Sequence, residues 1–298
     1  MQIAKLTLDA INRNLEADDG AKFRGYFKEA LSEISDAFND VPDLLPRSHL
    51  GGSLIGRPCI RELWYSFHWA TKKLIPGRLV RLFHRGHLEE ARFIALVRVA
   101  GLQSWHSQDG KQFRISDHGG HYGGSLDGVC VGCADIPGGE AALLEFKTHG
   151  KKSFKKLTDE GVRIAKPEHY AQCNQYMGKM GLNWTLYMAV EKDTDELHLE
   201  VFPFDPVNYA FHLDKALSIV VATEPPPKLN QSPAWYECKW CDHAKVCHFN
   251  EPALKNCRTC RWVQIRDNGI WYCCFHDTPQ DKASQFAGCE FHEYITGV

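Results

Sequence analysis

The sequence lacks a long hydrophobic run, a strong charge of either sign and an internal repeat. No stretch of about 18 apolar residues occurs in the chain of 298, so we expect no membrane-spanning helix. The segment MQIAKLTLDAINRNLEADDG is too polar for a signal peptide. The formal net charge of -2 argues against a protein that coats nucleic acid through bulk charge, while a local basic groove stays compatible with it. We therefore expect a cytoplasmic protein without membrane contacts.

The sequence also lacks a fingerprint for flavin or nicotinamide, which argues against a redox enzyme. At 44% hydrophobic and 24% charged residues, it falls in the ordinary range of globular proteins. Its length suits one medium domain with an appendage.

What the chain does contain is cysteine, 12 in all, with seven between Cys238 and Cys274 and Cys289 shortly after. In a reducing compartment, clustered cysteines hold metals more often than they form disulfides. Their spacing is therefore the first indication of metal sites.

Periodicity predicts an α/β fold with a mixed central sheet flanked by helices. Helical spacing covers residues 1–40, and Pro and Gly in PDLLPRSHLGGSLIGRP interrupt it. The further expected helices are 59–69, 80–99, 167–180 and 206–222. The expected strands are 111–116, 121–132, 140–148 and a pair joined at residues 192–195.

Two carboxylates and a lysine are placed to converge on neighbouring strands. Because side chains alternate along a strand, Glu145 and Lys147 share one face while Phe146 points to the core. Asp127 on the preceding strand can approach Glu145, and two close carboxylates favour a hard cation such as Mg²⁺ or Mn²⁺. Lys147 could orient or deprotonate a water, or stabilise charge on a phosphate. Glu-x-Lys is, however, also the pattern of a plain surface ion pair.

Two flanking helices carry matching motifs. His87 and Glu90 lie three residues apart in FHRGHLEEARFIALV, and Gln172 and Tyr176 lie four apart in KPEHYAQCNQYMGKMGL, so each pair shares a helix face. This order resembles the PD-(D/E)XK nuclease superfamily, in the branch of lambda exonuclease, RecB-type nucleases and iron-sulfur CRISPR adaptation nucleases. The resemblance implies a restriction-endonuclease-like core. Surface helix faces and ordinary packing are the alternatives for these four residues.

By this resemblance, Asp127 and Glu145 bind Mg²⁺ or Mn²⁺, and either His87 or Glu90 adds a ligand. The carbonyl of Phe146 supplies another. The remaining implied site residues are Lys147, which assists the attacking water, and Gln172 and Tyr176, which position the lysine or the phosphate.

The segments GSLDG, LLEFKTHGKKSF and KPEHYAQCNQYM also look like nucleases of tailed phages, over roughly residues 48–292. The resemblance implies an exonuclease that acts on DNA ends in phage recombination or replication, within the cytoplasm of an infected bacterium. DNA ends or single strands are then the partners, with a phage single-strand-binding or recombinase protein as a further one. The alternatives are a flap or single-strand endonuclease, and an inactive metal-stapled DNA-binding protein.

The first cysteine set, Cys238-x2-Cys241-x5-Cys247, supplies three thiolates and needs a fourth. In the iron-sulfur members of the resembled branch, the fourth cysteine comes from far upstream, where Cys59 stands here. We predict a [4Fe-4S] cluster on these four residues. Zinc at the same ligands, or Cys59 as a plain buried cysteine, is the alternative.

The second set has the spacing of a zinc ribbon. Cys257-x2-Cys260 is followed by Cys273 and Cys274 and then by Cys289. Similarity to phage tails selects Cys273 over Cys274, and His276 and His292 are reserve ligands. The predicted boundaries are an N-terminal helical segment over 1–47, a nuclease core over 48–250 and a zinc-binding tail over 251–298.

Two basic stretches border these motifs. Arg57, Arg61, Trp64 and Tyr65 form a basic and aromatic cluster that could hold a DNA end, although a core position is favoured for the tryptophan. The lysines after the catalytic strand, in GKKSFKKL, suit a DNA backbone or a solvated helix face.

Overall fold

The computed structural model describes residues 1–34, 46–72, 75–108 and 111–298. It divides into two compact units, each assembled from separate chain segments. Unit 1 comprises residues 1–42, 75–115 and 125–209, and unit 2 comprises residues 43–74, 116–124 and 210–298. The domain boundaries expected after residues 47 and 250 stay predictions.

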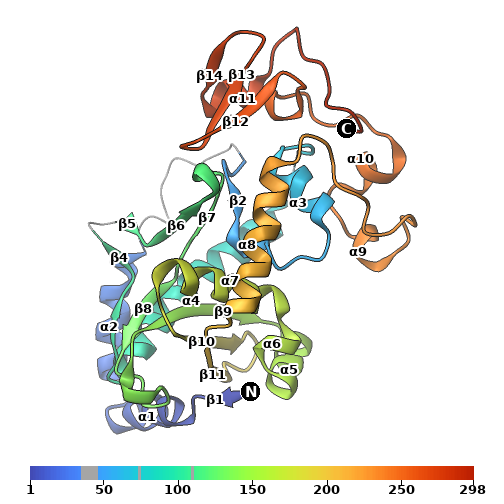
Figure 1. Cartoon of the computed structure of the whole chain (residues 1–298). Helices are drawn as coiled ribbons and strands as arrows, with labels where there is room; N and C mark the ends of the chain where they lie inside the picture. Colours follow the sequence, from blue (N-terminus) through green and yellow to red (C-terminus); the bar gives the residue numbers. More distant parts are fainter. Residues whose placement is uncertain (35–45, 73–74, 109–110) are drawn as a thin grey trace. The chain divides into compact units, whose positions relative to one another are not determined.

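Unit 1 is built on a six-stranded mixed sheet with the strand order β1-β11-β10-β9-β8-β3 (Figure 1). The central strands β9 (Ala142–His149) and β10 (Trp184–Glu191) are parallel, and the other neighbours are antiparallel. The outer strands are β1 (Gln2–Ile3), β11 (Leu197–Pro203), β8 (Gly128–Val131) and β3 (Gln103–Trp105). The expected mixed sheet is therefore confirmed.

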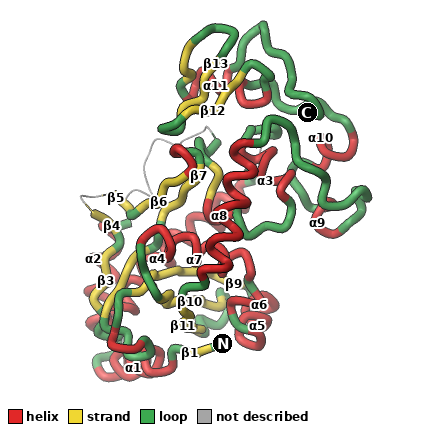
Figure 2. Tube along the Cα trace, in the orientation of Figure 1, coloured by secondary structure: helices red, strands yellow, loops and turns green. Residues whose placement is uncertain are grey.

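Helices cover both faces of this sheet (Figure 2). On one face, α1 (Lys5–Ala17), α2 (Ala21–Glu33) and α4 (Gly77–Val99) pack on Leu144, Phe146 and Met188. On the other, α5 (Lys151–Glu160), α6 (Val162–Ala165) and α7 (Pro167–Met180) pack on Leu143 and Tyr187. Alternate residues of β9 thus enter opposite cores, as the strand period of two requires.

The sequence pattern locates most of these elements. The helical spacing in residues 1–40 gives α1 and α2, and the expected helix 167–180 is α7, which ends at the left-handed Gly181 with φ 68°. The expected pair around residues 192–195 is the antiparallel hairpin of β10 and β11.

Three expectations differ from the structure. The strand expected over 121–132 is two strands, β7 (Tyr122–Ser125) and β8, because the chain bends at Leu126 and Asp127. The strand expected over 111–116 is split into β5 (Lys111–Gln112), which pairs with β4 (Ser107–Gln108), and β6 (Arg114–Asp117). Helix α5 was not expected, because its sequence contains four lysines and little apolar periodicity. Phe154 and Leu157 nevertheless form a buried apolar face.

Unit 2 combines short helices with small sheets. The antiparallel strands β12 (Val263–Arg266), β13 (Ile270–Cys273) and β14 (Thr278–Gln280) form one sheet, and β2 (Leu50–Gly51) pairs with β7 in another. The helices are α3 (Ile60–Phe67), α9 (Tyr236–Lys239), α10 (Ala244–Phe249) and α11 (Lys282–Ala287). Helix α8 (Pro206–Val221) starts in unit 1 and continues in unit 2.

The core of unit 2 contains a fully buried arginine. The Arg258 guanidinium lies 3.7 Å from the ring centroid of Trp69 and 4.3 Å from that of Trp271. It donates to the carbonyls of Phe67 (2.9 Å) and Ser48 (3.0 Å) and to the side chain of Gln285 (2.8 Å). Burial lowers its pKa to about 8. Aromatic faces and carbonyl oxygens thus replace water around a cation, which ties three distant segments together.

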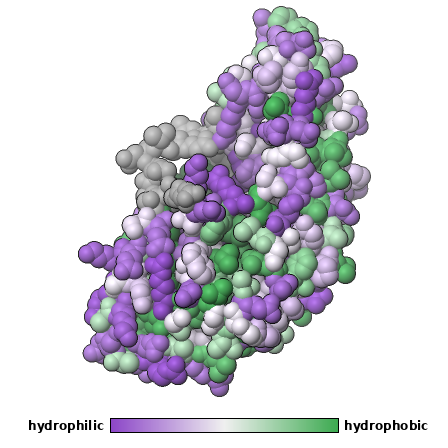
Figure 3. All heavy atoms as spheres, turned by 60° about the vertical axis from the view of Figure 1, so that its left-hand side comes forward, coloured by the Kyte–Doolittle hydropathy of each residue, from purple (hydrophilic) through white to green (hydrophobic). Residues whose placement is uncertain are grey.

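No helix in the described ranges is long and apolar enough to cross a membrane. The face in Figure 3 shows hydrophilic residues with smaller groups of hydrophobic ones among them.

We predict that Leu186→Ala, in the core shared with α1, α2 and α4, lowers the free energy of unfolding by about 2–5 kcal/mol, because Leu186 is 0% exposed and leaves a cavity. Leu6→Ala, at a position 57% exposed, is the control and should change it little. Urea unfolding followed by circular dichroism measures both. Equal effects of the two variants would contradict the assigned core.

Candidate functional site

The register of β8 and β9 brings Asp127 to Glu145. The two strands pair from Ala142 to Leu144, with Gly128 opposite Leu144. Asp127 lies one residue before β8, and its Oδ2 accepts a hydrogen bond from the backbone N–H of Phe146 at 2.7 Å. The Asp127 carboxylate is therefore turned toward β9.

Glu145 and Lys147 lie on one face of β9, and Phe146 enters the core on the other. Glu145 is fully buried, and its Oε1 forms an ion pair with the partly buried Lys147 ammonium. Its Oε2 is buried and has no hydrogen-bond partner among the described residues. One buried carboxylate oxygen thus stays unsatisfied, which is costly unless a donor or cation reaches it.

Helix α4 contributes Glu90 to this cluster. The charges of Asp127 and Glu145 both act to raise the pKa of Glu90, so this side chain lies near theirs. His87 lies one helical turn earlier and lines, with Glu90 and Lys147, a cavity of about 330 Å³. The pKa of His87 is lowered by burial and by His84, with no contribution from the acidic cluster. The acidic neighbours thus act on Glu90, while both side chains line the cavity.

The acidic groups shift one another's protonation. Burial, followed by the charge of Asp127, raises the pKa of Glu90. Burial also raises the pKa of Glu145, against the lowering effect of Lys147. Burial would lower the pKa of Lys147, but Glu145 and Asp127 outweigh it and raise that pKa. Without a cation, the crowded acidic groups therefore keep protons that isolated carboxyl groups would lose.

The two motif residues of α7, Gln172 and Tyr176, lie in different surroundings. The Gln172 side chain acts to lower the pKa of the Glu145 carboxyl, so Gln172 lies beside the cluster. Tyr176 is 2% exposed and packs in the core formed by α5, α6 and α7.

As the side chains stand, no group of three or more His, Cys, Asp or Glu in the described part of the chain could hold a metal ion. This applies to the carboxylate cluster and to both cysteine sets below.

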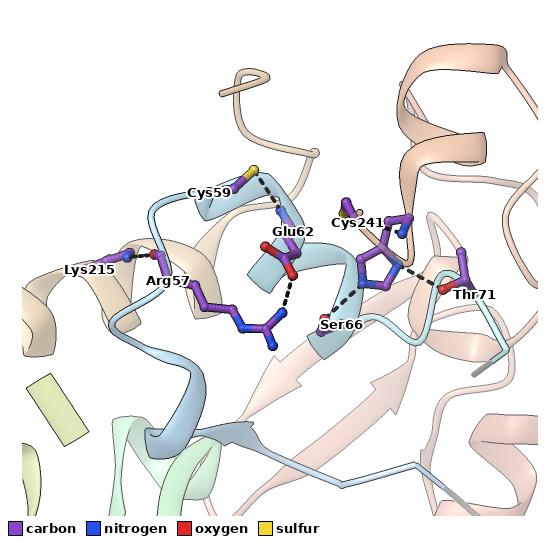
Figure 4. A network of polar contacts seen from close by, with 8 residues as sticks. Arg57, Cys59, Glu62, Ser66, Thr71, Lys215 and Cys241 are labelled. Atoms are coloured by element: carbon purple, nitrogen blue, oxygen red, sulfur yellow. Dashed lines mark hydrogen bonds and ion pairs between the residues drawn. The ribbon is translucent and has the colours of Figure 1, made fainter. Parts of the chain in front are cut away.

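The four cysteines of the first set line one pocket in unit 2. Cys59 lies at the start of α3, and the other three lie in or near α9 and α10: Cys238, Cys241 and Cys247. Burial raises the pKa of the Cys241 thiol to about 12, and nearby Glu62, Cys59 and Cys247 add to the shift. The Sγ of Cys59 accepts the backbone N–H of Glu62 at 3.3 Å (Figure 4). The room among these thiols is about 20 Å³.

Neighbouring polar contacts hold this pocket in place (Figure 4). Glu62 forms an ion pair with Arg57. The ring of His243 contacts the hydroxyls of Ser66 and Thr71, each at 2.9 Å, while its backbone N–H donates to the Sγ of Cys241 at 3.4 Å. The pocket is thereby linked to α3.

The second cysteine set also converges within unit 2. Cys257, Cys260, Cys273 and Cys289 line one cavity of about 210 Å³, together with His276 and His292. Burial, then the charges of Cys273, Cys289 and Cys260, raises the pKa of Cys257 to about 11. Cys273 is buried and accepts the backbone N–H of His276 at 3.5 Å, whereas Cys274 is exposed. These contacts favour Cys273 over Cys274 in this group.

The basic stretches are largely engaged in structure. Trp64 and Tyr65 are at most 1% exposed, and the indole N–H of Trp64 donates to the carbonyl of Ala222 at 2.9 Å. These two rings therefore belong to the core and cannot stack on DNA bases. On α5, Lys155 pairs with Asp159 at 2.9 Å.

Three residues near the cluster were not identified from the sequence: Tyr187, His149 and His169. Tyr187 lies opposite Glu145 in the parallel pairing of β9 and β10, and its hydroxyl contacts the rings of His149 and His169. No sequence motif indicates these contacts, because they depend on the pairing of β9 with β10.

No protein-family model matches the chain, and no curated protein does either. Among solved structures, the chain is similar to LHK-Exo in complex with dAMP, at 14% identity and TM-score 0.38 over 66% of this chain and 90% of that one. It is likewise similar to the alkaline exonuclease LHK-Exo from Laribacter hongkongensis, at 14% identity and TM-score 0.39 over 58% and 87%. Similarity at this level does not establish a family.

The raised carboxyl pKa values predict a pH dependence of stability. Because the folded state keeps protons on Glu90 and Glu145 that the unfolded chain loses near pH 4.5, the free energy of unfolding should fall as pH rises from there through neutrality. Without divalent cations, Glu90→Gln should raise it at pH 8 by on the order of 1 kcal/mol, and by less at pH 5.

Urea unfolding at both pH values in EDTA measures this difference, with Glu16→Gln on the exposed side of α1 as the matched control. A Glu90→Gln protein that is less stable than the wild type at pH 8 would show that Glu90 is satisfied in the folded state.

Proposed function

We propose that this chain is a metal-dependent DNA nuclease, and specifically an exonuclease that acts on DNA ends. The observation that supports this best is the gathering of Glu90, Asp127 and Glu145 around Lys147, with Glu90 and Lys147 lining one cavity. Acidic groups that repel one another around a lysine are expected where a cation and a phosphate are bound.

The carboxylate set suits a hard divalent cation such as Mg²⁺ or Mn²⁺. Glu145 Oε2 is buried without a partner, and the pKa of Glu90 is raised by its acidic neighbours, so a cation would relieve both costs. Glu145 Oε1 is paired with Lys147, and Asp127 Oδ2 accepts a hydrogen bond from Phe146 N–H. The two carboxylates would therefore have to rearrange when a cation binds.

Glu90, Asp127, Glu145 and the carbonyl of Phe146 would hold the cation, which supplies an activated water and charge neutralisation. Lys147 stays protonated because its pKa is raised, so it would act as a donor to the phosphate and not as a base. Gln172 would hold the Glu145 carboxyl in place. Tyr176 would support α7 from the core.

The preference for DNA ends follows from the sequence resemblance to nucleases that act on DNA ends. The cavity beside Lys147 is lined by Phe83 and His87 as well as Glu90, which would give a base and a phosphate room next to the carboxylates.

We predict that Asp127→Ala reduces Mg²⁺-dependent degradation of linear DNA more than about 100-fold, beyond the effect usual for an outer-shell residue. Release of nucleotides from end-labelled duplex by the pure protein measures it. Asp159→Ala, which removes an exposed ion-pair partner on α5, is the matched control and should keep full activity.

Undiminished degradation by Asp127→Ala would refute the site. Cleavage of closed circular DNA would favour the flap or single-strand endonuclease. Wild-type protein that binds DNA but degrades none with Mg²⁺ or Mn²⁺ would favour the inactive DNA-binding protein.

We further propose that both cysteine sets bind metals. Four thiols in one pocket suit thiolate coordination, and a metal would release the protons that burial now retains. Cys59, Cys238, Cys241 and Cys247 line one pocket, and their thiols would have to turn toward one another to hold either a [4Fe-4S] cluster or a zinc. The set of Cys257, Cys260, Cys273 and Cys289 suits zinc.

Metal analysis of anaerobically purified protein tests these sites. We expect Cys257→Ser to lose one zinc and Cys59→Ser to lose the metal of the other set, because each removes one of four ligands. Exposed Cys274→Ser is the control and should keep both metals. Absorption at about 400 nm with iron present would establish the cluster, and two zincs would overturn it. Metal-free wild-type protein would contradict both sites.

A further inference from the structure

A chain of hydrogen bonds in unit 1 leads from Lys166 to His169 through the interior beside the carboxylate cluster. The Nζ of Lys166 contacts the hydroxyl of Ser153, which lies 3.1 Å from Nδ1 of His149. The Nε2 of His149 lies 3.2 Å from the hydroxyl of Tyr187, which lies 2.8 Å from Nδ1 of His169. The chain connects β9, β10, α5 and the start of α7.

Both rings in this chain are neutral at ordinary pH. Burial, followed by the charges of Lys147, His149 and Lys166, lowers the pKa of His169 to about 2. Burial, followed by Lys166 and Lys147, lowers the pKa of His149 to about 4. Each ring therefore carries one N–H, and its position decides what the ring can donate.

The distances favour one direction of donation. An O–H donor usually lies 2.7–2.8 Å from its acceptor and an N–H donor nearer 2.9–3.0 Å. The 2.8 Å contact suits donation by Tyr187 to Nδ1 of His169, and the 3.2 Å contact suits donation by Nε2–H of His149 to Tyr187. The Ser153 hydroxyl accepts a hydrogen bond from Lys166, so it can donate its own proton to Nδ1 of His149. The proton of His169 is then on Nε2.

The Nε2 of His169 makes no hydrogen bond among the described residues. His169 is partly buried, and its Nε2 is not among the buried unpaired atoms, so this atom keeps some solvent exposure. The electrostatic effects on the ring come from Lys147, His149 and Lys166, and all three lower its pKa. An N–H donor in positive surroundings, close to Lys147, suits an anionic oxygen.

We propose that His169 is a substrate-binding residue of this site, whose Nε2–H donates to a non-bridging oxygen of the phosphodiester beside Lys147. Tyr187, His149, Ser153 and Lys166 are positioning residues that fix its tautomer. The proposal rests on the nuclease function proposed above. It adds a neutral donor from α7 to the ammonium donor from β9.

The tautomer is tested by long-range ¹H–¹⁵N correlation spectra of the full chain with labelled histidine. We expect His169 to be protonated at Nε2 and not to titrate between pH 5 and 9. A short oligonucleotide added with Ca²⁺ in place of Mg²⁺ should shift its Nε2 resonance. Tyr187→Phe should mix the two tautomers of His169. If His169 carries its proton on Nδ1, or titrates between pH 5 and 9, the proposed direction of the hydrogen bonds is wrong, whatever the activity of the protein.

The role in catalysis is tested by kcat and KM on DNA. We expect His169→Ala to lower kcat/KM about 100-fold, the effect of losing one donor to a developing charge. His169→Gln, which keeps an N–H near the Nε2 position, should recover part of this loss. A phosphorothioate of defined stereochemistry at the scissile position should slow the wild type more than His169→Ala.

Met180→Ala, on the exposed end of α7, is the matched control and should not change kcat/KM. If the wild type degrades DNA and His169→Ala does so equally well, the donor role is overturned while the nuclease function stands. If the wild type neither degrades DNA nor shows a shift with the oligonucleotide, the proposed function and the donor role both fail.

Discussion

The parallel pairing of β9 with β10 over eight residues is the constraint on which the site in unit 1 depends. It sets Tyr187 opposite Glu145 and Ala189 opposite Lys147, so the carboxylate and the ammonium lie against a phenol and a methyl group. Parallel strands need a crossover connection, and here α5, α6 and α7 supply it. The crossover places Gln172 and His169 on the same side of the sheet as Glu145.

The same arrangement is costly for stability. Glu145 is fully buried with one unpaired oxygen, and Glu90 is held near two other acids. A fold selected only for stability would replace such a group with apolar side chains of similar volume. Functional sites are where a protein tolerates such local conflicts, because substrate or cation binding relieves them.

Sequence reasoning reached what depends on local periodicity. The alternation of Glu145, Phe146 and Lys147 follows from the strand period, and Gln172 lies on the inward face of a helix whose ends were also foreseen. The long helices and the strands β9, β10 and β11 of unit 1 follow from the same patterns, whereas α5 and the short strands do not.

The remainder depends on how elements rotate and pair. Choosing Glu90 over His87 requires the orientation of α4 about its axis, and separating Cys273 from Cys274 requires the face of β13 that turns to the other thiols. Trp64 beside two arginines has the composition of a nucleic-acid surface, and only its burial shows that it packs inside. Tyr187 could be linked to the site only through long-range strand pairing.

Arg258 has a consequence for how the protein is made. Its guanidinium binds the carbonyls of Ser48 and Phe67 and the side chain of Gln285, which are separated by more than half of the chain. During synthesis, the early segments of unit 2 must therefore wait for the last ones, with Trp69 lacking its cationic partner until the ribosome has passed residue 258. Unit 2 should therefore complete its folding late in translation, with its early apolar residues lacking their packing partners until then.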